Sequence, residues 1–470
     1  MEDQTWPESP FYSRRHILAL GGGAAAAAIL AACGSDSKAS PTTTAAPAGS
    51  AAPGGSTAAT TASTVASSGG GKDGTIKIGY VTPQTGALAP FGEADVFVLG
   101  ALRDFFKSGV DIGGKSYTIQ IIDKDSESNS NTAAAAANDL ITKEGVQMMC
   151  VAQTPDTTVP VVQACTNNEI PVLSNNAPWQ PHYLGIGGKL GPGITPAVAS
   201  KWNYHFFWGL EDVIAVFTKM WADVAPGATV GAMWPDDPDG NAWSDPGVGF
   251  PPALAKGGFK LVDPGRFPLG ASDFTAQISK FKDAGVEIVT GVMIPPDFGN
   301  FWAQCQQQGF KPKAVTVGKC LLFPGAVASY QNPIGLSSEI WWSDKHPTKS
   351  SLTGQTSAEL AAAYTTATTK QWTQPVGYVH SLFEVAIDAL KRAGGAGDKE
   401  ALLQAMGATN LDTIAGKVDF THPVVPNITK TPLVGGQWVK GKTYPVEFKI
   451  VTNDELPAIP LDGKLEAITY

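Results

Sequence analysis

From residue 75 onward, short runs of apolar and β-branched residues alternate with stretches whose apolar residues recur at helical spacing. Residues 75–81 have a strand pattern, and residues 92–108 have a helical one. The alternation resumes over 204–317, after a Gly- and Pro-rich segment at 181–196. Alternating strands and helices with short loops predict an α/β fold with mainly parallel sheets covered by helices. In such sheets, ligands bind beyond the carboxyl ends of the strands.

The Gly- and Pro-rich segment divides the alternation into two blocks, which predicts two lobes joined by crossing strands. A long amphipathic stretch near residue 385 indicates that the chain returns to the first lobe before it ends. We therefore expect the first lobe to comprise 74–203 with 335–413, and the second to comprise 204–334 with 414–470.

The N-terminal segment carries an arginine pair, Arg14 and Arg15, before an apolar stretch that ends in two alanines and Cys33. This order resembles the twin-arginine signal and the lipobox of bacterial lipoproteins, whose cysteine sulfur takes a lipid. Residues 1–33 therefore predict an export signal with Cys33 as the lipidation site. Residues 34–73 are rich in Ser, Thr, Ala, Pro and Gly, which predicts a disordered tether. We expect the body to be anchored at the outer face of a bacterial cell membrane.

Charge and composition narrow the classes of partner. The formal net charge is −9 and the isoelectric point is about 5.2. Nucleic-acid binders normally present a basic face to phosphates, so no nucleic-acid partner is expected. The apolar run at 17–32 is too short for a membrane-spanning helix of about 20 residues. Apart from the lipid at Cys33, we expect no insertion into the membrane.

The segment 78–87, Ile-Gly-Tyr-Val-Thr-Pro-Gln-Thr-Gly-Ala, resembles the start of ABC-transporter substrate-binding proteins of the branched-chain amino-acid (leucine/isoleucine/valine-binding) family. Gly-Gly-Lys at 113–115, then 154–160 and 170–174, follow the order of that family's first lobe. The resemblance implies a type I periplasmic-binding fold, in which two lobes joined by hinge strands close over a small ligand. It also implies a monomer that delivers its ligand to an ABC permease.

Residues at strand ends, and residues matched to the family, predict the ligand site. Thr154 and Asp156 begin a helix, where hydroxyl and free backbone N–H groups could hold a carboxylate or another polar head group. The alternative is a simple helix cap, for which both residue types are common. For any single tryptophan, core packing is the more common role, but the tryptophans at strand ends as a group favour a ligand with an apolar or aromatic body. The predicted ligand-binding residues are Gln84, Phe91, Gln153, Thr154, Asp156, Thr157, Asn175, Asn176, Trp179, Trp208, Asp239, Asn241, Trp243, Pro295 and Lys319.

Two departures from the family argue against an α-amino-acid ligand. The acidic residue that meets the ligand's ammonium in the family should fall near Lys319, where no carboxylate stands, and a lysine would repel an ammonium. The aromatic residue usual after Trp234 is replaced by the acidic segment 236–241. We expect instead a small ligand with a polar head and a partly apolar or aromatic body.

Four cysteines remain in the body, an even number in a chain predicted to be exported, so disulfides are expected. Of the three possible connectivities, pairing of Cys150 with Cys165 and of Cys305 with Cys320 is preferred, because each pair spans one strand and helix neighbourhood. The alternative is four buried thiols. No CxxC or HxxxH spacing accompanies the cysteines, so no metal site is expected.

Motifs of catalysis and of cofactor binding are missing from the sequence. There is no GxSxG elbow, no HExxH and no P-loop, and the glycines at 185–193 lack the setting of a dinucleotide site. We therefore expect a binding protein without a cofactor rather than an enzyme. The alternatives are a sensing lipoprotein of the same fold without transport, and an exported hydrolase whose catalytic group comes from distant residues.

Overall fold

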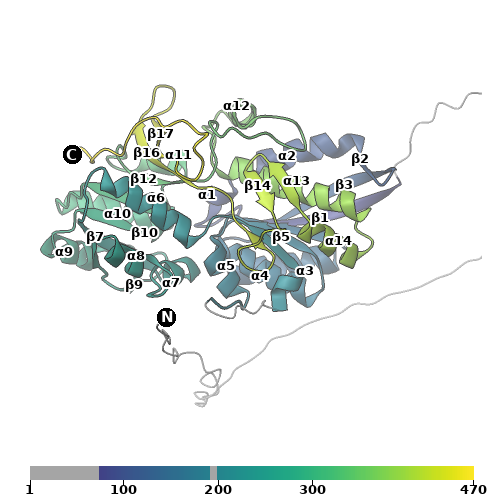
Figure 1. Cartoon of the computed structure of the whole chain (residues 1–470), viewed down its shortest axis with the longest axis horizontal. Helices are drawn as coiled ribbons and strands as arrows, with labels where there is room; N and C mark the ends of the chain where they lie inside the picture. The colour runs from purple at the N-terminus through teal and green to yellow at the C-terminus, as the bar shows by residue number, and fades with distance from the viewer. Residues whose placement is uncertain (1–72, 191–197) are drawn as a thin grey trace, which may run out of the picture. The chain divides into compact units, whose positions relative to one another are not determined.

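The computed structural model describes residues 73–190 and 198–470. The predicted export signal, the lipidation site Cys33 and nearly all of the predicted tether lie outside the described residues. The described residues fall within one compact unit, in which two sheets are each flanked by helices (Figure 1). None of the described helices has the length and apolar character needed to cross a membrane.

The first sheet has seven strands in the order β15-β6-β5-β4-β1-β3-β2. Neighbouring strands are parallel except β2 and β3, which form an antiparallel pair. The apolar segment that begins at Thr75 forms β1, an interior strand between β4 and β3. Its Ile and Val side chains are buried, as expected for a strand covered on both faces. The strands are β1 (Gly74–Thr82), β2 (Val110–Ile112), β3 (Lys115–Asp125), β4 (Met148–Val151), β5 (Val172–Asn175), β6 (Asn203–Phe206) and β15 (Ile428–Thr429).

The second sheet also follows a mainly parallel order, β17-β16-β12-β11-β10-β7-β8, with β9 beside β7. Only β12, β16 and β17 pair in antiparallel fashion. A separate hairpin is formed by β13 (Asn410–Thr413) and β14 (Gly416–Asp419). The strands of the second sheet are β7 (Thr229–Pro235), β8 (Lys260–Val262), β9 (Arg266–Phe267), β10 (Ile288–Met293), β11 (Ala314–Lys319), β12 (Ser337–Ile340), β16 (Val434–Lys440) and β17 (Val446–Thr452).

Helices cover both faces of each sheet, so the strands are buried on both sides. In Figure 1, α3, α4 and α5 lie along one side of the first sheet, and α2 and α13 along the other. The helices of the first lobe are α1 (Ala89–Gly92), α2 (Asp95–Phe105), α3 (Ser130–Thr142), α4 (Thr154–Asn167), α5 (Trp179–Gly185), α12 (Ser357–Thr368), α13 (Pro375–Ala393) and α14 (Lys399–Gly407), with 3-10 turns at Phe106–Ser108 and Val198–Lys201. Those of the second lobe are α6 (Leu210–Ala222), α7 (Pro238–Trp243), α8 (Phe250–Lys256), α9 (Thr275–Asp283), α10 (Pro295–Gln307) and α11 (Pro324–Ser329).

The predicted α/β class with mainly parallel sheets is confirmed by this topology. Two strands extend the sheets past the expected lobe boundaries. The strand β6 pairs with β5 in the first sheet, and β12 pairs with β11 in the second. The chain crosses again between β15 in the first sheet and β16 in the second, so the stretch after residue 413 contributes to both. These crossings bring the ends of β6 and β12 to the boundary between the lobes.

The four cysteines of the body are free and buried, which corrects the preferred disulfide prediction and agrees with the alternative of four thiols. Successive side chains of a strand point to opposite faces of its sheet. Cys150 of β4 packs on the face that holds Tyr80, whereas Cys165 of α4 packs on the opposite face with Val151. The Sγ of Cys320 lies 4.0 Å from the carbonyl oxygen of Val317 in its own segment.

Candidate functional site

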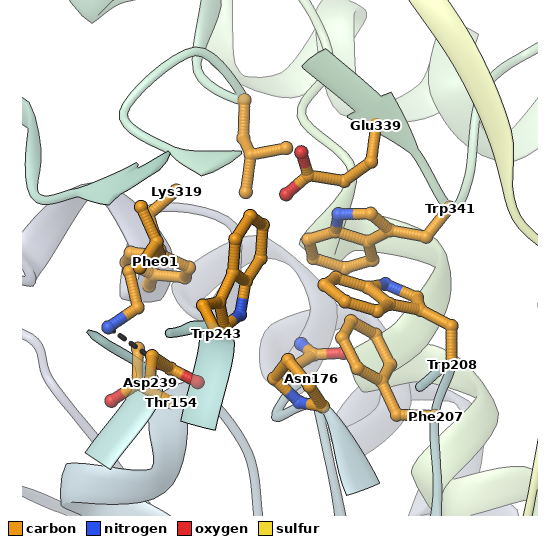
Figure 2. Close-up of a pocket in the computed structure, with 13 residues that line it drawn as sticks. Phe91, Thr154, Asn176, Phe207, Trp208, Asp239, Trp243, Lys319, Glu339 and Trp341 are labelled. Atoms are coloured by element: carbon orange, nitrogen blue, oxygen red, sulfur yellow. Dashed lines mark ion pairs between the residues drawn. The ribbon is translucent and has the colours of Figure 1, made fainter. Parts of the chain in front are cut away.

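A pocket lies where the carboxyl ends of strands from both sheets face each other, and thirteen residues line it (Figure 2). The first lobe contributes residues that follow β1, β4, β5 and β6, and the second lobe contributes residues in or after β7, β10, β11 and β12. This is the edge at which open parallel sheets bind ligands. The lining residues are Phe91, Thr154, Asn176, Pro178, Phe207, Trp208, Asp239, Trp243, Val292, Lys319, Leu322, Glu339 and Trp341.

On the first-lobe side, two loops are tied to each other just beyond β4 and β5. The backbone N–H of Thr154 donates to the carbonyl oxygen of Asn176 at 3.0 Å, and Asn176 Nδ2 donates to Gln153 Oε1 at 3.0 Å. Gln153, Thr154 and Asn176 have φ values of 75°, 59° and 58°. A positive φ is costly for a β-branched residue such as Thr154. The hydrogen bonds between the two loops therefore keep the backbone of Thr154 in a strained conformation. The Thr154 hydroxyl and Asn176 Oδ1 have no hydrogen-bond partner among the described residues.

A buried polar network supports these loops from behind. His182 and His205 stack with ring centroids 4.0 Å apart. Ser174 Oγ lies 2.9 Å from His205 Nδ1, and His205 Nε2 lies 2.9 Å from the carbonyl oxygen of Ala177. Burial lowers the pKa of His182 to about 4, so both partners of the stack stay neutral and bridge polar groups without charge. The network fixes the backbone beside Asn176.

The second-lobe side holds a buried ion cluster around the ammonium of Lys319. Lys319 Nζ lies 2.6 Å from Asp239 Oδ2 and 3.1 Å from Asp237 Oδ2, and the three side chains are 8% exposed or less. Burial alone would lower the pKa of Lys319, but the carboxylates of Asp237, Asp239 and Asp156 outweigh it and raise the pKa. Burial raises the pKa of Asp239 to about 7, against the opposing effect of Lys319. Asp239 Oδ1 has no hydrogen-bond partner among the described residues.

A second acidic side chain, Glu339, reaches the pocket from β12 and is 2% exposed. Ser338 Oγ donates to Glu339 Oε2 at 2.6 Å, and the backbone N–H of Lys319 also donates to this carboxyl group. Burial raises the pKa of Glu339, and these hydrogen bonds oppose the rise. Among the described residues no lysine, arginine or histidine forms an ion pair with Glu339.

Five of the thirteen lining residues are aromatic, and both lobes contribute them. Figure 2 shows Trp208 and Trp341 on one side of the space and Trp243 across from them, with the carboxyl group of Glu339 directed toward these rings. The ring of Phe207 packs against Trp208 and Trp341 with centroid distances of 4.9 and 5.2 Å. The indole N–H groups of the three tryptophans have no hydrogen-bond partner among the described residues.

The pocket is narrow in this conformation. Only about 20 Å³ of the space between the lining side chains can take the centre of a water molecule. That space suits one or two waters, because a single water needs roughly 10–15 Å³ by this measure. A larger ligand therefore requires the lobes to separate or the rings to turn, and the structure corresponds to a nearly closed cleft.

A family model described as periplasmic binding protein matches residues 75–442, which is most of the described chain. The chain belongs to the periplasmic binding protein family. This match confirms the predicted fold and the predicted class of ligand-binding protein. The match does not extend to the predicted branched-chain amino-acid subfamily. No curated protein sequence matches the chain significantly.

Solved structures of binding proteins share the fold of this family member at low sequence identity. A leucine-binding protein from Thermotoga maritima is 18% identical, with a TM-score of 0.63 over 81% of this chain and 100% of that one. A solute-binding protein from Rhodopseudomonas palustris BisB5, solved with 3,4-dihydroxybenzoic acid, is 18% identical, with a TM-score of 0.62 over 84% and 98% of the two chains. These likenesses establish the two-lobed type I periplasmic-binding fold.

The binding protein brings seven of the sequence-predicted site residues into one pocket. The seven are supplied by both lobes, as the strand-end argument requires. They are Phe91, Thr154, Asn176, Trp208, Asp239, Trp243 and Lys319.

The other predicted site residues lie outside the lining of this pocket. Gln153 and Asn175 are buried behind it, the latter donating from Nδ2 to the carbonyl oxygen of Tyr378 at 2.8 Å. Trp179 donates from Nε1 to Glu211, and Gln84 donates from Nε2 to Asp123. The remaining four are the buried Thr157 in α4, Asp156 and Pro295, which border separate grooves, and Asn241, which contacts Arg266.

Six lining residues of the binding protein were not anticipated. Two of them, Glu339 and Trp341, surround the end of β12, a strand whose sequence was taken as the return to the first lobe. The sequence did contain a signal for Glu339, which stands in the apolar run Glu339-Ile340-Trp341-Trp342. Acidic residues are almost never fully buried unless they are paired, so a glutamate in such a run indicates a partner or a ligand. The others are Pro178, Phe207, Val292 and Leu322, which are apolar residues with no distinguishing signal.

Proposed function

We propose that this protein is an extracytoplasmic, lipid-anchored solute-binding protein that captures a small molecule between its lobes and delivers it to an ABC permease. One observation carries the proposal: five aromatic rings from both lobes enclose a single pocket that also contains buried, unpartnered polar atoms. Buried polar groups are nearly always satisfied, so unpartnered ones in a pocket favour a ligand that completes them.

The proposed ligand has a polar head and a partly apolar or aromatic body. The rings of Trp208, Trp243 and Trp341 offer flat apolar surface, and the Thr154 hydroxyl and Asn176 Oδ1 offer polar contacts next to it. Solved proteins of this fold accept such molecules: one from Streptococcus pneumoniae holds isoleucine, and one from Rhodopseudomonas palustris holds 4-hydroxybenzoate.

The ion cluster changes the argument against an ammonium group that the sequence suggested. Lys319 is paired with Asp237 and Asp239, so its charge is already balanced inside the second lobe. Carboxyl groups also reach the pocket, although from Asp239 and Glu339 rather than from the segment around Lys319. A positively charged ligand group is therefore compatible with the site.

The anchor at Cys33 completes the proposed mechanism. A lipid on this cysteine and a tether over 34–73 would hold the binding protein near a membrane permease while leaving the body free to turn. Tethering raises the effective concentration of the body at its partner. Mass spectrometry of the protein purified from bacterial membranes tests this step: a diacylglycerol on Cys33 supports it, and an unmodified Cys33 in the mature protein contradicts it.

Thermal unfolding of the purified protein against a panel of small molecules tests capture itself. The panel contains amino acids, aromatic acids, amines, amides and short fatty acids. A ligand that binds only the folded state raises the melting temperature by mass action, by an amount that grows with its concentration. A concentration-dependent rise with one class supports capture. No rise with any class, or release of a hydrolysed product, contradicts it.

A further inference from the structure

The charges of the pocket indicate what kind of head group it can accept, an inference that rests on the proposed function. Lys319 is the one cationic side chain that lines the pocket in the described residues, and it already contacts Asp237 and Asp239. Asp156 adds a third nearby carboxyl group to this cluster. The ammonium of Lys319 is therefore surrounded by three carboxyl groups, and Glu339 adds a fourth carboxyl group to the pocket.

An anionic head group finds few backbone donors at the start of α4. The start of α4 is the place where backbone N–H groups were expected to hold a carboxylate. The N–H of Thr154 is donated to the carbonyl oxygen of Asn176, and the next residue, Pro155, has no N–H. The α4 start therefore lacks two of the donors that a helix N-terminus usually offers to an anion. A carboxylate would also lie beside the carboxyl groups of Asp239 and Glu339, which disfavours it.

A cationic head group finds acceptors and aromatic faces together. Asn176 Oδ1 and Asp239 Oδ1 are buried oxygens without a partner among the described residues, and Glu339 has no cationic partner there. The rings of Trp208, Trp243 and Trp341 stand around the same space, and the Glu339 carboxyl group is directed toward them (Figure 2). Tryptophan faces attract cations through the ring quadrupole, and cages of several rings recognise quaternary ammonium groups.

We propose that the pocket binds an organic cation, a small amine or quaternary ammonium compound with an apolar or aromatic body, and that Glu339 supplies the counter-charge. The aromatic faces surround the apolar part and the N-methyl or N–H groups of the ammonium. The indole N–H groups lie at the ring edges and donate to neutral acceptors such as a ligand hydroxyl or water.

Isothermal titration of the full-length protein with matched probes tests the charge preference. The probes share one ring and differ in charge: benzylammonium and benzyltrimethylammonium as cations, benzoate as the anion, and benzyl alcohol as the neutral isostere. We expect either cation to bind at least about ten-fold more tightly than benzoate, a difference of about 1.4 kcal/mol. Binding of benzoate as tightly as the cations overturns the inference but leaves capture of a small molecule standing.

The variant Glu339→Gln tests the role assigned to this carboxyl group, since it keeps the shape and removes the charge. It should weaken cation binding about ten-fold and leave benzyl alcohol within about two-fold. Glu400→Gln, at an exposed acidic residue of α14, is the matched control and should bind every probe as the unmodified protein does. Equal weakening of cation and alcohol, or no weakening of either, contradicts the assignment. If no probe binds, the inference fails, and the wider thermal panel separately decides whether the protein captures a ligand.

Discussion

At the scale of single residues, the ammonium of Lys319 determines the charge balance of the cleft. Removing one partner of a buried ion pair leaves the other charge without compensation, which typically costs about 3–5 kcal/mol. We expect Lys319→Met to lower the free energy of unfolding by that order, because Asp237 and Asp239 would remain buried. Urea denaturation measures the change.

The matched control for this variant is Lys313→Met. Lys313 pairs with Glu287 at 2.8 Å, but both side chains are at least 40% exposed. Exposed pairs contribute roughly 0–1 kcal/mol, so this variant should unfold nearly as the unmodified protein does. Equal losses in both variants would show that the buried cluster has no special role.

A second residue-scale prediction concerns the buried Asp95, which accepts hydrogen bonds from Tyr80 and Thr82. Burial raises the pKa of Asp95 to about 7, so the folded state holds this proton more tightly than the unfolded chain. The resulting stability is present at low pH and is lost as pH rises from about 4 to 7, by roughly 1.4 kcal/mol per unit. Asp95→Asn has no proton to lose. Its stability relative to the unmodified protein should therefore increase between about pH 5 and pH 8, and parallel pH profiles would refute the assignment.

Residues at the cleft differ in how far the sequence predicted them. Thr154, Asn176 and Trp208 lie shortly after β4, β5 and β6, and all three line the pocket, as expected for residues beyond the carboxyl ends of parallel strands. Glu339 was missed because its strand was taken as part of the return to the first lobe. The partners of Lys319 could not be predicted either, since their pairing depends on the side-chain packing between β11 and α7.

At the scale of elements, the short helix α7 carries both Asp239 and Trp243 into the pocket. It can lie so close to β7 only because residue 240 is glycine: a Cβ atom there would stand 1.9 Å from the carbonyl oxygen of Pro235. Gly240→Ala must therefore shift the helix. We expect it to weaken binding of the best thermal-shift ligand by at least about ten-fold, measured by calorimetry.

Gly100→Ala is the control for the glycine variant. Gly100 lies inside α2, and a Cβ atom there meets nothing within 4 Å. Alanine is the better helix former, so this variant should gain about 0.5–1 kcal/mol of stability without any change in affinity. An unchanged affinity in Gly240→Ala would contradict the claim that the position of α7 is needed for ligand binding.

The major elements were predictable because long alternating patterns define them. The alternation predicted over 204–317 appears in the structure as strands that include β7, β10 and β11, with helices between them. Very short elements escaped, since the two-residue strands β9 and β15 have no periodicity to detect. The lobe boundaries were displaced for the same reason: β6 and β12 are four-residue strands whose sheet is decided by pairing rather than by local pattern.

At the scale of the whole molecule, the narrow pocket implies movement of the lobes. About 20 Å³ of water-accessible space cannot admit a ligand of the proposed size, so the lobes must separate or the rings must turn, and the family fold favours separation of the lobes. Small-angle X-ray scattering should give a smaller radius of gyration with saturating ligand than without it. The same radius in both states would contradict closure by hinge bending.

The central claim is that one ligand binds among the aromatic rings between the lobes. Calorimetry of the unmodified protein with its strongest thermal-shift ligand, beside Trp208→Ala and Trp372→Ala, tests it most directly. Trp208 lines the pocket, whereas Trp372 packs against Trp342 away from it. We predict one ligand per chain, an affinity at least about ten-fold weaker in Trp208→Ala, and an unchanged affinity in Trp372→Ala. Equal affinity in all three proteins would contradict the claim.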